Sequence, residues 1–271
     1  MSEDATFRDL VSRHQRRLYL FLRALLPAAA EAEAALRETN LQLWQRGRDV
    51  RADKFADFAE GIARKVAADR SKAPSHFSEE LFRQLADSAG PSLELADKRP
   101  AVISGLFEQL PLPDRDLLRR RYELGMTAEQ IALSENRPVA AVNRDLAGLH
   151  ASLVAAIRER LPDSGPEPPG GALDLGRLTG QLLNGTISDD GRLVLETLLL
   201  ADAAAQAHYH RHVALIAELT MRFCGLPPLT EPPAPPTPRV SRREQVVTWA
   251  FVAACTIVFL FLIFLFTGWL R

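Results

Sequence analysis

Cysteine is scarce in this sequence of 271 residues: the only two are Cys224 and Cys255, which argues against a disulfide framework and favours a reducing compartment. Aromatic residues make up only 7% of the chain, and strand-forming runs of Val, Ile and Thr are nearly absent before residue 246. Positive and negative charges nearly balance, with a formal net charge of −1. The whole chain therefore carries no basic field that would indicate a nucleic-acid partner. What is abundant is Ala and Leu, within 47% hydrophobic residues, and this composition predicts an all-α fold.

The motifs that mark common enzyme classes are also missing. The sequence contains no glycine-rich phosphate loop, no nucleophile constellation and no zinc-ligand spacing. His208, His210 and His212 stand two residues apart, so a helix would point them to different faces, and we interpret them as core or solvated residues. We therefore expect no enzymatic activity, no metal and no cofactor.

The longest uncharged stretch, 246–270, lies at the end of the sequence. It is longer than the roughly 20 apolar residues that a membrane-spanning helix needs, and Trp249 and Trp269 flank it as interface aromatics do. Three arginines precede the stretch and one follows it. The apolar length predicts a single transmembrane helix, and the positive-inside rule predicts that the N-terminal part lies in the cytoplasm. The first 26 residues lack the apolar core of a signal peptide.

Two proline-rich stretches, 162–171 and 227–238, divide the remainder. Such runs behave as extended spacers and do not build a core. They predict a first block at 1–161, a small helical block at 172–226 and a spacer at 227–245 before the apolar segment.

Apolar residues recur at three- and four-residue steps through the first block, which predicts helices. We expect them from Phe7 to Leu25, at roughly 31–46 and 53–71, as a short piece around 81–85, and again from Ala101. The pattern loosens over 86–99. Pro111 and Pro113 are expected to stop the helix that begins at Ala101, and Asp114 is expected to cap the next.

The stretch 122–149 carries the signals of two short helices joined by a tight turn. Thr127 and Gln130 have the spacing of a capping box, and Asn136 can adopt the left-handed conformation that a turn requires. Pro138 suits the first turn of the second helix. This pattern fits a DNA-reading helix-turn-helix, and it equally fits an ordinary helical hairpin in a bundle.

The run LFEQLPLPDRDLLRRRYELGMTAEQIALSENRPVAAVNRDLAGLHASL, residues 106–153, resembles region 4 of extracytoplasmic-function sigma factors, a branch of the sigma-70 family. LVSRHQRRLYLFLRALLPAAAEAEAALRETNLQLWQR at 10–46 and DKFADFAEGIARKVAADRSK at 53–72 resemble region 2. The two matches occur in the family's order. The resemblance implies a region 2-like domain at 1–73, a linker at 74–100 and a region 4-like domain at 101–161.

The resemblance also implies core RNA polymerase and promoter DNA as partners. Region 4 would read the −35 element through Arg137, Asn143 and Arg144. Region 2 would open the −10 element with aromatic and cationic residues, namely Phe55, Phe58, Arg64, Lys65, Arg70 and Lys72. Its second helix would dock on the polymerase through Glu38, Asn40 and Gln42.

The sequence departs from the family in its charge. Residues 1–161 hold 25 Lys and Arg against 24 Asp and Glu, and Asp145 lies where family members carry arginines. Phosphate contacts supply most non-specific affinity, so DNA binding is expected to be weak. Two alternatives remain open: a degenerate sigma-like module that binds a partner protein without promoter recognition, and a membrane-bound helix-turn-helix regulator.

The block at 172–226 is expected to form three helices, the second capped by Ser188 and the third by Asp202. Its sequence resembles non-zinc anti-sigma domains, which implies an intramolecular contact that restrains the sigma-like part. The apolar residues expected in its core or at that contact are Leu193, Leu198, Val213 and Ile216.

Overall fold

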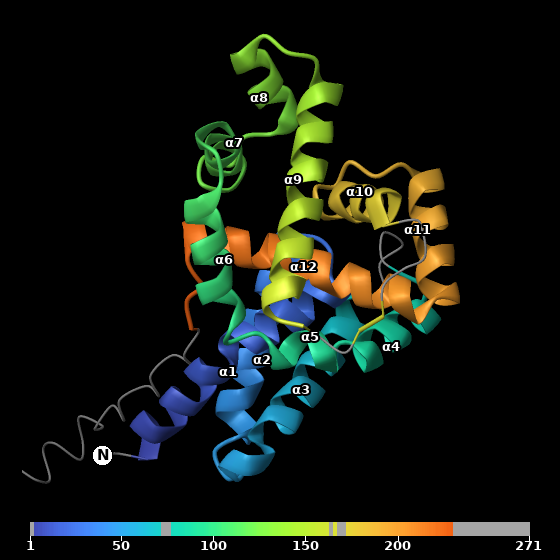
Figure 1. The fold of residues 1–271 in the computed structure, drawn as a ribbon. Helices are drawn as coiled ribbons and strands as arrows, with labels where there is room; N and C mark the ends of the chain where they lie inside the picture. The colour runs from blue at the N-terminus through green and yellow to red at the C-terminus, as the bar shows by residue number, and fades with distance from the viewer. Residues whose placement is uncertain (1–2, 72–76, 163–164, 167–171, 230–271) are drawn as a thin grey trace, which may run out of the picture. The chain divides into compact units, whose positions relative to one another are not determined.

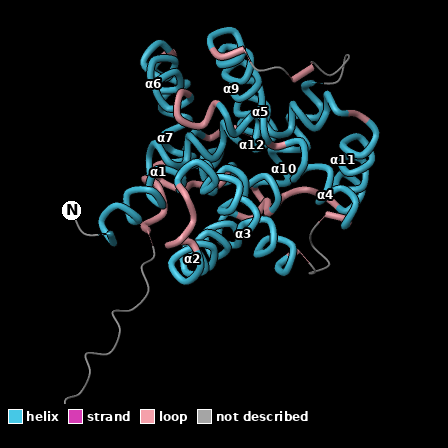
Figure 2. Tube along the Cα trace, turned by 90° about the horizontal axis from the view of Figure 1, so that it is seen from below, coloured by secondary structure: helices cyan, strands magenta, loops and turns pink. Residues whose placement is uncertain are grey.

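The computed structural model describes residues 3–71, 77–162, 165–166 and 172–229. Within these ranges the chain is built from helices joined by loops and turns, and no strand is present there (Figure 2). The all-α part of the predicted fold class is therefore confirmed for the described residues.

The predicted fold class needs one correction, because it included a transmembrane helix. Among the helices of the described ranges, none combines the length and the apolar character needed to cross a membrane. The predicted span at 246–270 lies outside the described residues. The second proline-rich spacer lies outside them as well, except for its first residues up to Leu229.

The N-terminal part contains five helices and one short 3-10 turn. They are α1 (Glu3–Leu25), α2 (Ala29–Arg46), η1 (Ala52–Lys54), α3 (Phe55–Arg70), α4 (Glu79–Ser88) and α5 (Gly90–Glu94). The stretch 74–100, predicted as a linker, thus contains two helices, and Leu81 and Leu85 of α4 are completely buried. Their one-sided apolar pattern explains why a short helix could be expected there, and Ser78 caps it by accepting a hydrogen bond from the Leu81 amide.

Seven further helices follow along the chain. They are α6 (Arg99–Gln109), α7 (Leu112–Tyr122), α8 (Ala128–Glu135), α9 (Val139–Arg160), α10 (Ala172–Leu183), α11 (Asp189–Ala201) and α12 (Ala203–Cys224). One predicted boundary was wrong: α7 begins at Leu112, with Pro113 in its first turn, and Asp114 does not cap it. Proline is tolerated there because the first amides of a helix have no intrahelical acceptor. Ser188 and Asp202 do cap α11 and α12, as predicted.

Three hydrophobic clusters hold these helices together. The largest joins α1–α5 to α10, α11 and one side of α12, through residues such as Tyr209 and Val213. The second joins α6, α7 and the C-terminal half of α9 to Leu215 and Leu219 of α12. The third is small and lies between α7, α8 and the start of α9. Helix α12, which runs across the middle of Figure 1, therefore contributes to two of the three clusters.

The contacts between elements place the described residues in a first compact unit, bounded by Met1 and Glu231, and residues 232–271 lie outside the described ranges. Within the first unit, α12 packs against α1, α4 and α5, against α6, α7 and α9, and against α10 and α11. Most of its length is buried on every side, including charged and polar residues such as Glu218 and His212.

Candidate nucleic-acid and polymerase interfaces

The helix-turn-helix signals in the sequence correspond to the observed local structure. The Thr127 hydroxyl accepts a hydrogen bond from the Gln130 amide at 3.3 Å, and the Gln130 side chain accepts one from the Thr127 amide at 2.8 Å. This closes the predicted capping box at the start of α8. Asn136 ends α8 with φ of 53° and ψ of 46°, the left-handed conformation expected of it. Gly125, which lies between α7 and α8, has a positive φ of 64°.

A small apolar cluster fixes how α9 presents its first turns. Ile131 and Ala132 of α8 pack on Val142 and Leu146 of α9, with Leu117 of α7 beneath them. With Val142 and Leu146 turned inward, the helical period turns Asn143 and Arg144 outward, and both are exposed. Helix α8 contacts α7 and α9, whereas α12 contacts the opposite end of α9, so the first turns of α9 are not covered by α12 (Figure 1).

The third residue predicted to read DNA, Arg137, is held by two carboxylates. Its guanidinium donates to Glu135 at 2.9 Å and also to Asp145, eight residues further along. Residues 122–149 carry two arginines, Arg137 and Arg144, against four carboxylates, which gives a local net charge of −2. The structure thus brings the three predicted residues to one end of α9, where two carboxylates engage Arg137.

The residues predicted to act on the −10 element are divided between core and surface. Phe55 is completely buried, with its ring centroid 5.9 Å from that of Phe7, and Phe58 is partly buried against the same cluster. Lys65 is exposed on α3, while Lys72 lies outside the described residues.

The two arginines of this predicted set bind neighbouring carboxylates. Arg64 donates to Asp87 of α4 at 2.6 Å, and Arg70 donates to Glu38 of α2 at 2.9 Å. Both side chains remain partly exposed. The aromatic residues therefore support the core, and a surface of mixed charge is left around α3.

The residues predicted to bind polymerase occupy different faces of α2. Glu38 and Gln42 are partly exposed, whereas Asn40 is completely buried. Neither amide atom of Asn40 has a hydrogen-bond partner among the described residues. A surface partner can reach Glu38 and Gln42 in this conformation, but not Asn40.

The sequence predicted α12 as a helix, but its periodicity did not show that this helix packs against most of the others. The Tyr209 hydroxyl donates to the Ala24 carbonyl of α1 at 2.9 Å, and Glu218 accepts an ion-paired hydrogen bond from Arg16 of α1. The Glu218 side chain is only 2% exposed, and burial raises the pKa of its carboxyl to about 7, partly opposed by Arg16 and Arg99. On another side, Arg222 of α12 donates to Glu108 of α6 at 3.1 Å. A signal was present in the sequence, because residues 203–224 contain only three charged side chains.

The histidines of α12 are all buried. His210 hydrogen-bonds Ser88 of α4 at 3.0 Å, and burial lowers its pKa to about 4. His208 and His212 face α10, and His212 also approaches His150 of α9. No group of three or more potential ligands within the described residues is arranged to hold a metal ion.

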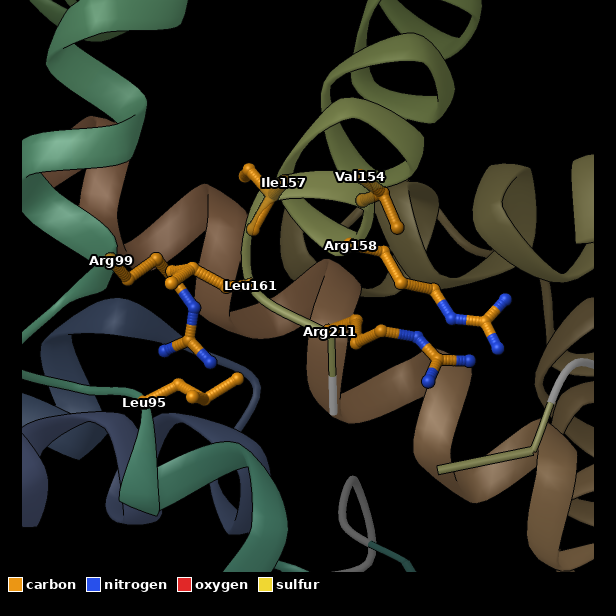
Figure 3. Close-up of a pocket in the computed structure, with 7 residues that line it drawn as sticks. All are labelled: Leu95, Arg99, Val154, Ile157, Arg158, Leu161 and Arg211. Atoms are coloured by element: carbon orange, nitrogen blue, oxygen red, sulfur yellow. The ribbon is translucent and has the colours of Figure 1, made fainter. Parts of the chain in front are cut away.

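A small pocket lies where α5, α6, α9 and α12 meet, and three arginines line it (Figure 3). Arg99 donates to the Ser92 carbonyl at 2.8 Å, and Arg211 donates to the Pro166 carbonyl at 3.0 Å. Arg158 donates to the Gly165 carbonyl at 3.5 Å. Arg99 thus binds a carbonyl of α5, and Arg158 and Arg211 bind carbonyls in the segment after α9, so we interpret the pocket as a structural junction rather than an anion site.

Comparisons with protein-family models, with curated proteins and with solved structures found no match.

Proposed function

We propose that the chain is a sigma factor-like transcription initiation protein that binds core RNA polymerase and promoter DNA, and that α10–α12 form its in-chain regulatory element. The proposal starts from the two sequence resemblances in the family's order. It is supported by the capped helix-turn-helix, whose second helix presents Asn143 and Arg144 at its exposed start.

The observation that carries the regulatory part is the position of α12 between two clusters. Tyr209 and Val213 pack with α1–α5, while Leu215 and Leu219 pack with α6 and α9. Helix α12 therefore holds the region 2-like and region 4-like parts in one compact unit.

The size of this compact unit limits which promoter elements it can contact at the same time. The −10 and −35 elements lie roughly 25 base pairs apart, which is about 85 Å along the duplex at ~3.4 Å per base pair. A compact unit of this length has a radius of gyration of only about 17 Å. It cannot reach both elements at once, so we assign the described conformation to a restrained state that must open before initiation.

The proposal is tested with the full chain and the double variant Leu215→Ala, Leu219→Ala. Truncating two buried leucines weakens the contact of α12 with α6 and α9 by about 2–5 kcal/mol for each residue. We expect the variant to co-purify with core polymerase better than the wild type and to give more run-off transcript. Leu193→Ala, an exposed leucine on α11, is the matched control and should behave as wild type. If circular dichroism shows folded protein but neither chain binds core polymerase, the proposed function is wrong.

A second candidate function is binding of a partner protein without promoter recognition. One observation favours it: the local net charge of −2 over residues 122–149, with Arg137 engaged by Glu135 and Asp145. A promoter-binding module should lose DNA affinity as salt rises, with a slope set by the number of phosphates contacted. Polymerase binding with no measurable DNA affinity at low salt would favour this second candidate.

A further inference from the structure

Three imidazole rings lie together where α9, α10 and α12 meet. The ring centroid of His212 lies 5.6 Å from that of His150 and 6.3 Å from that of His208. His212 is 1% exposed, and neither of its ring nitrogens has a hydrogen-bond partner among the described residues. His150 is also buried, and its Nε2 hydrogen-bonds the Tyr122 hydroxyl of α7 at 2.9 Å. The cluster is thus enclosed and holds one imidazole with no polar partner to stabilise a charge.

Helix α10 covers this cluster with two glycines. A Cβ atom added at Gly176 would lie 3.5 Å from Nδ1 of His212 and 3.6 Å from Nε2 of His208. At Gly180 it would lie 3.8 Å from Nε2 of His212. The backbone of α10 therefore rests almost directly on the rings, and no side chain at these two positions of α10 can neutralise a charge formed on them.

The charged groups around the cluster also disfavour protonation. Arg121 of α7 acts on His150, and His150 and His208 act on His212, each in the direction that opposes a positive charge. The ionisable residues of α10 nearest in sequence to its glycines, Asp174 and Arg177, are exposed.

We propose that this imidazole cluster, His150, His208 and His212, is an acid-sensitive latch that releases α10 from α9 and α12 when His150 and His212 become protonated. The latch holds while the rings are neutral, because neutral rings pack closely against the glycines of α10. A proton on His212 places a buried charge against the backbone of α10, and a proton on His150 places one beside the His212 ring. Moving α10 away is the local change that admits water to these charges.

The stability of the closed state depends on pH because the histidine pKa values differ between the closed and the open state. Burial lowers the pKa of His150 to about 4 and holds the pKa of His212 well below its usual value. In the open state the pKa values of His150 and His212 return toward about 6.5. The stability of the closed state is therefore complete above about pH 6.5 and is lost as the pH falls below it. Near pH 5.5 each such histidine raises the opening constant about tenfold relative to pH 7.5.

The other face of α12 responds differently, which makes the release local. Glu218, paired with Arg16 of α1, has a raised pKa of about 7, so its contribution to the α1–α12 contact grows as pH falls. His210, which binds Ser88 of α4, has a lowered pKa of about 4 and acts in the opposite direction. These two effects offset each other, whereas the causes that act on His150 and His212 all lower their pKa values.

Amide hydrogen exchange of the full chain tests the latch, with each rate divided by the intrinsic rate at its pH. We expect the opening constant of α10 to rise about 100-fold between pH 7.5 and pH 5.5, and that of α1 to change by less than about fivefold. In the double variant His150→Gln, His212→Gln the rise at α10 should fall below about fivefold. His14→Gln, on α1 and outside the cluster, is the control and should keep the full rise. His150→Gln alone should reduce the rise in the opening constant of α10 about tenfold. This single variant replaces the double variant if the latter does not fold.

Two results would overturn the latch: an unchanged opening constant of α10 in the wild type, or an equal rise in α1 and α10, which is global acid unfolding. The consequence for regulation rests on the proposed function, whereas the exchange experiment does not. Local release of α10 at pH 5.5 without any polymerase binding at either pH would therefore support the latch and contradict the proposed function alone.

Discussion

Arg137 shows how single residues decide what the helix-turn-helix can bind. Glu135 and Asp145 both accept hydrogen bonds from its guanidinium. Ion pairs on a surface add little stability, so the main consequence of these carboxylates is electrostatic. They reduce the positive charge that the start of α9 can offer to phosphate groups.

Replacing Asp145 with asparagine should therefore strengthen DNA binding. The change removes one negative charge and one of the two carboxylates that bind Arg137, so the slope of log K against log salt should steepen by up to about 0.9, the value for one added phosphate contact. Arg144→Ala should act in the opposite direction and weaken binding. Fluorescence anisotropy with a short duplex at several salt concentrations measures both. Asp174→Asn, an exposed carboxylate on α10, is the control for net charge. Equal affinities and slopes in all four chains would mean that this surface does not contact DNA.

Glu218 is a residue whose protonation should be visible in the stability of the whole unit. Its folded-state pKa of about 7 lies above the usual 4.5 of a glutamate. Its contribution is therefore fully present below pH 4.5 and is lost as pH rises through 7, an effect of about 3 kcal/mol. In Glu218→Gln this loss disappears, so the stability of the variant relative to wild type should increase from pH 5 to pH 8. Urea unfolding at both pH values measures the difference. A relative stability that does not change between them would contradict the raised pKa, and Glu94→Gln, an exposed carboxylate, should show no such change.

Individual elements could be predicted where their signals are local. The capping box of α8 and the left-handed Asn136 depend on neighbouring residues alone, and both were predicted. The start of α7 was wrong because proline both stops a helix and suits its first turn, and only packing decides between the two. The short helix α5 was missed because its five residues give no periodic pattern.

The capping box should matter for α8, which is short and rests on a small cluster. Thr127→Ala removes the acceptor of the Gln130 amide and should destabilise α8 by about 0.5–2 kcal/mol. Hydrogen exchange of α8 amides should speed up by the corresponding factor, while that of α3 stays unchanged. Thr197→Ala on α11, where the hydroxyl only bonds back to the Leu193 carbonyl, is the matched control. Unchanged exchange of α8 would mean that the apolar cluster alone holds it.

At the scale of the whole molecule, the sequence could predict the order of the helices but not the role of α12. Apolar periodicity identifies one buried face, whereas α12 is buried on nearly all sides by helices far away in the chain. The four apolar residues expected in the core or at the contact therefore differ in burial. Val213 and Ile216 of α12 are buried, whereas Leu193 and Leu198 of α11 are exposed. Charge scarcity is the local signal of such a helix, because a helix buried all round has no face for charged residues.

If α12 couples the two large clusters, weakening one of its sides should uncouple them. Leu215→Ala with Leu219→Ala removes apolar groups that pack against α6 and α9, while Tyr209 and Val213 still hold α12 on α1–α5. We expect α6 and α9 amides to exchange through a local opening at least about 100-fold more often than in the wild type, because each truncation costs about 2–5 kcal/mol. Amides of α3 should keep their protection. Val213→Ala, on the opposite side of α12, should raise the amide exchange rates of α1. It should leave only a small difference in exchange between the amides of α3 and those of α9. Equal loss of protection in α3 and α9 in the double variant would show that the described part of the chain unfolds as one unit, and that α12 is part of a single core rather than a joint between two.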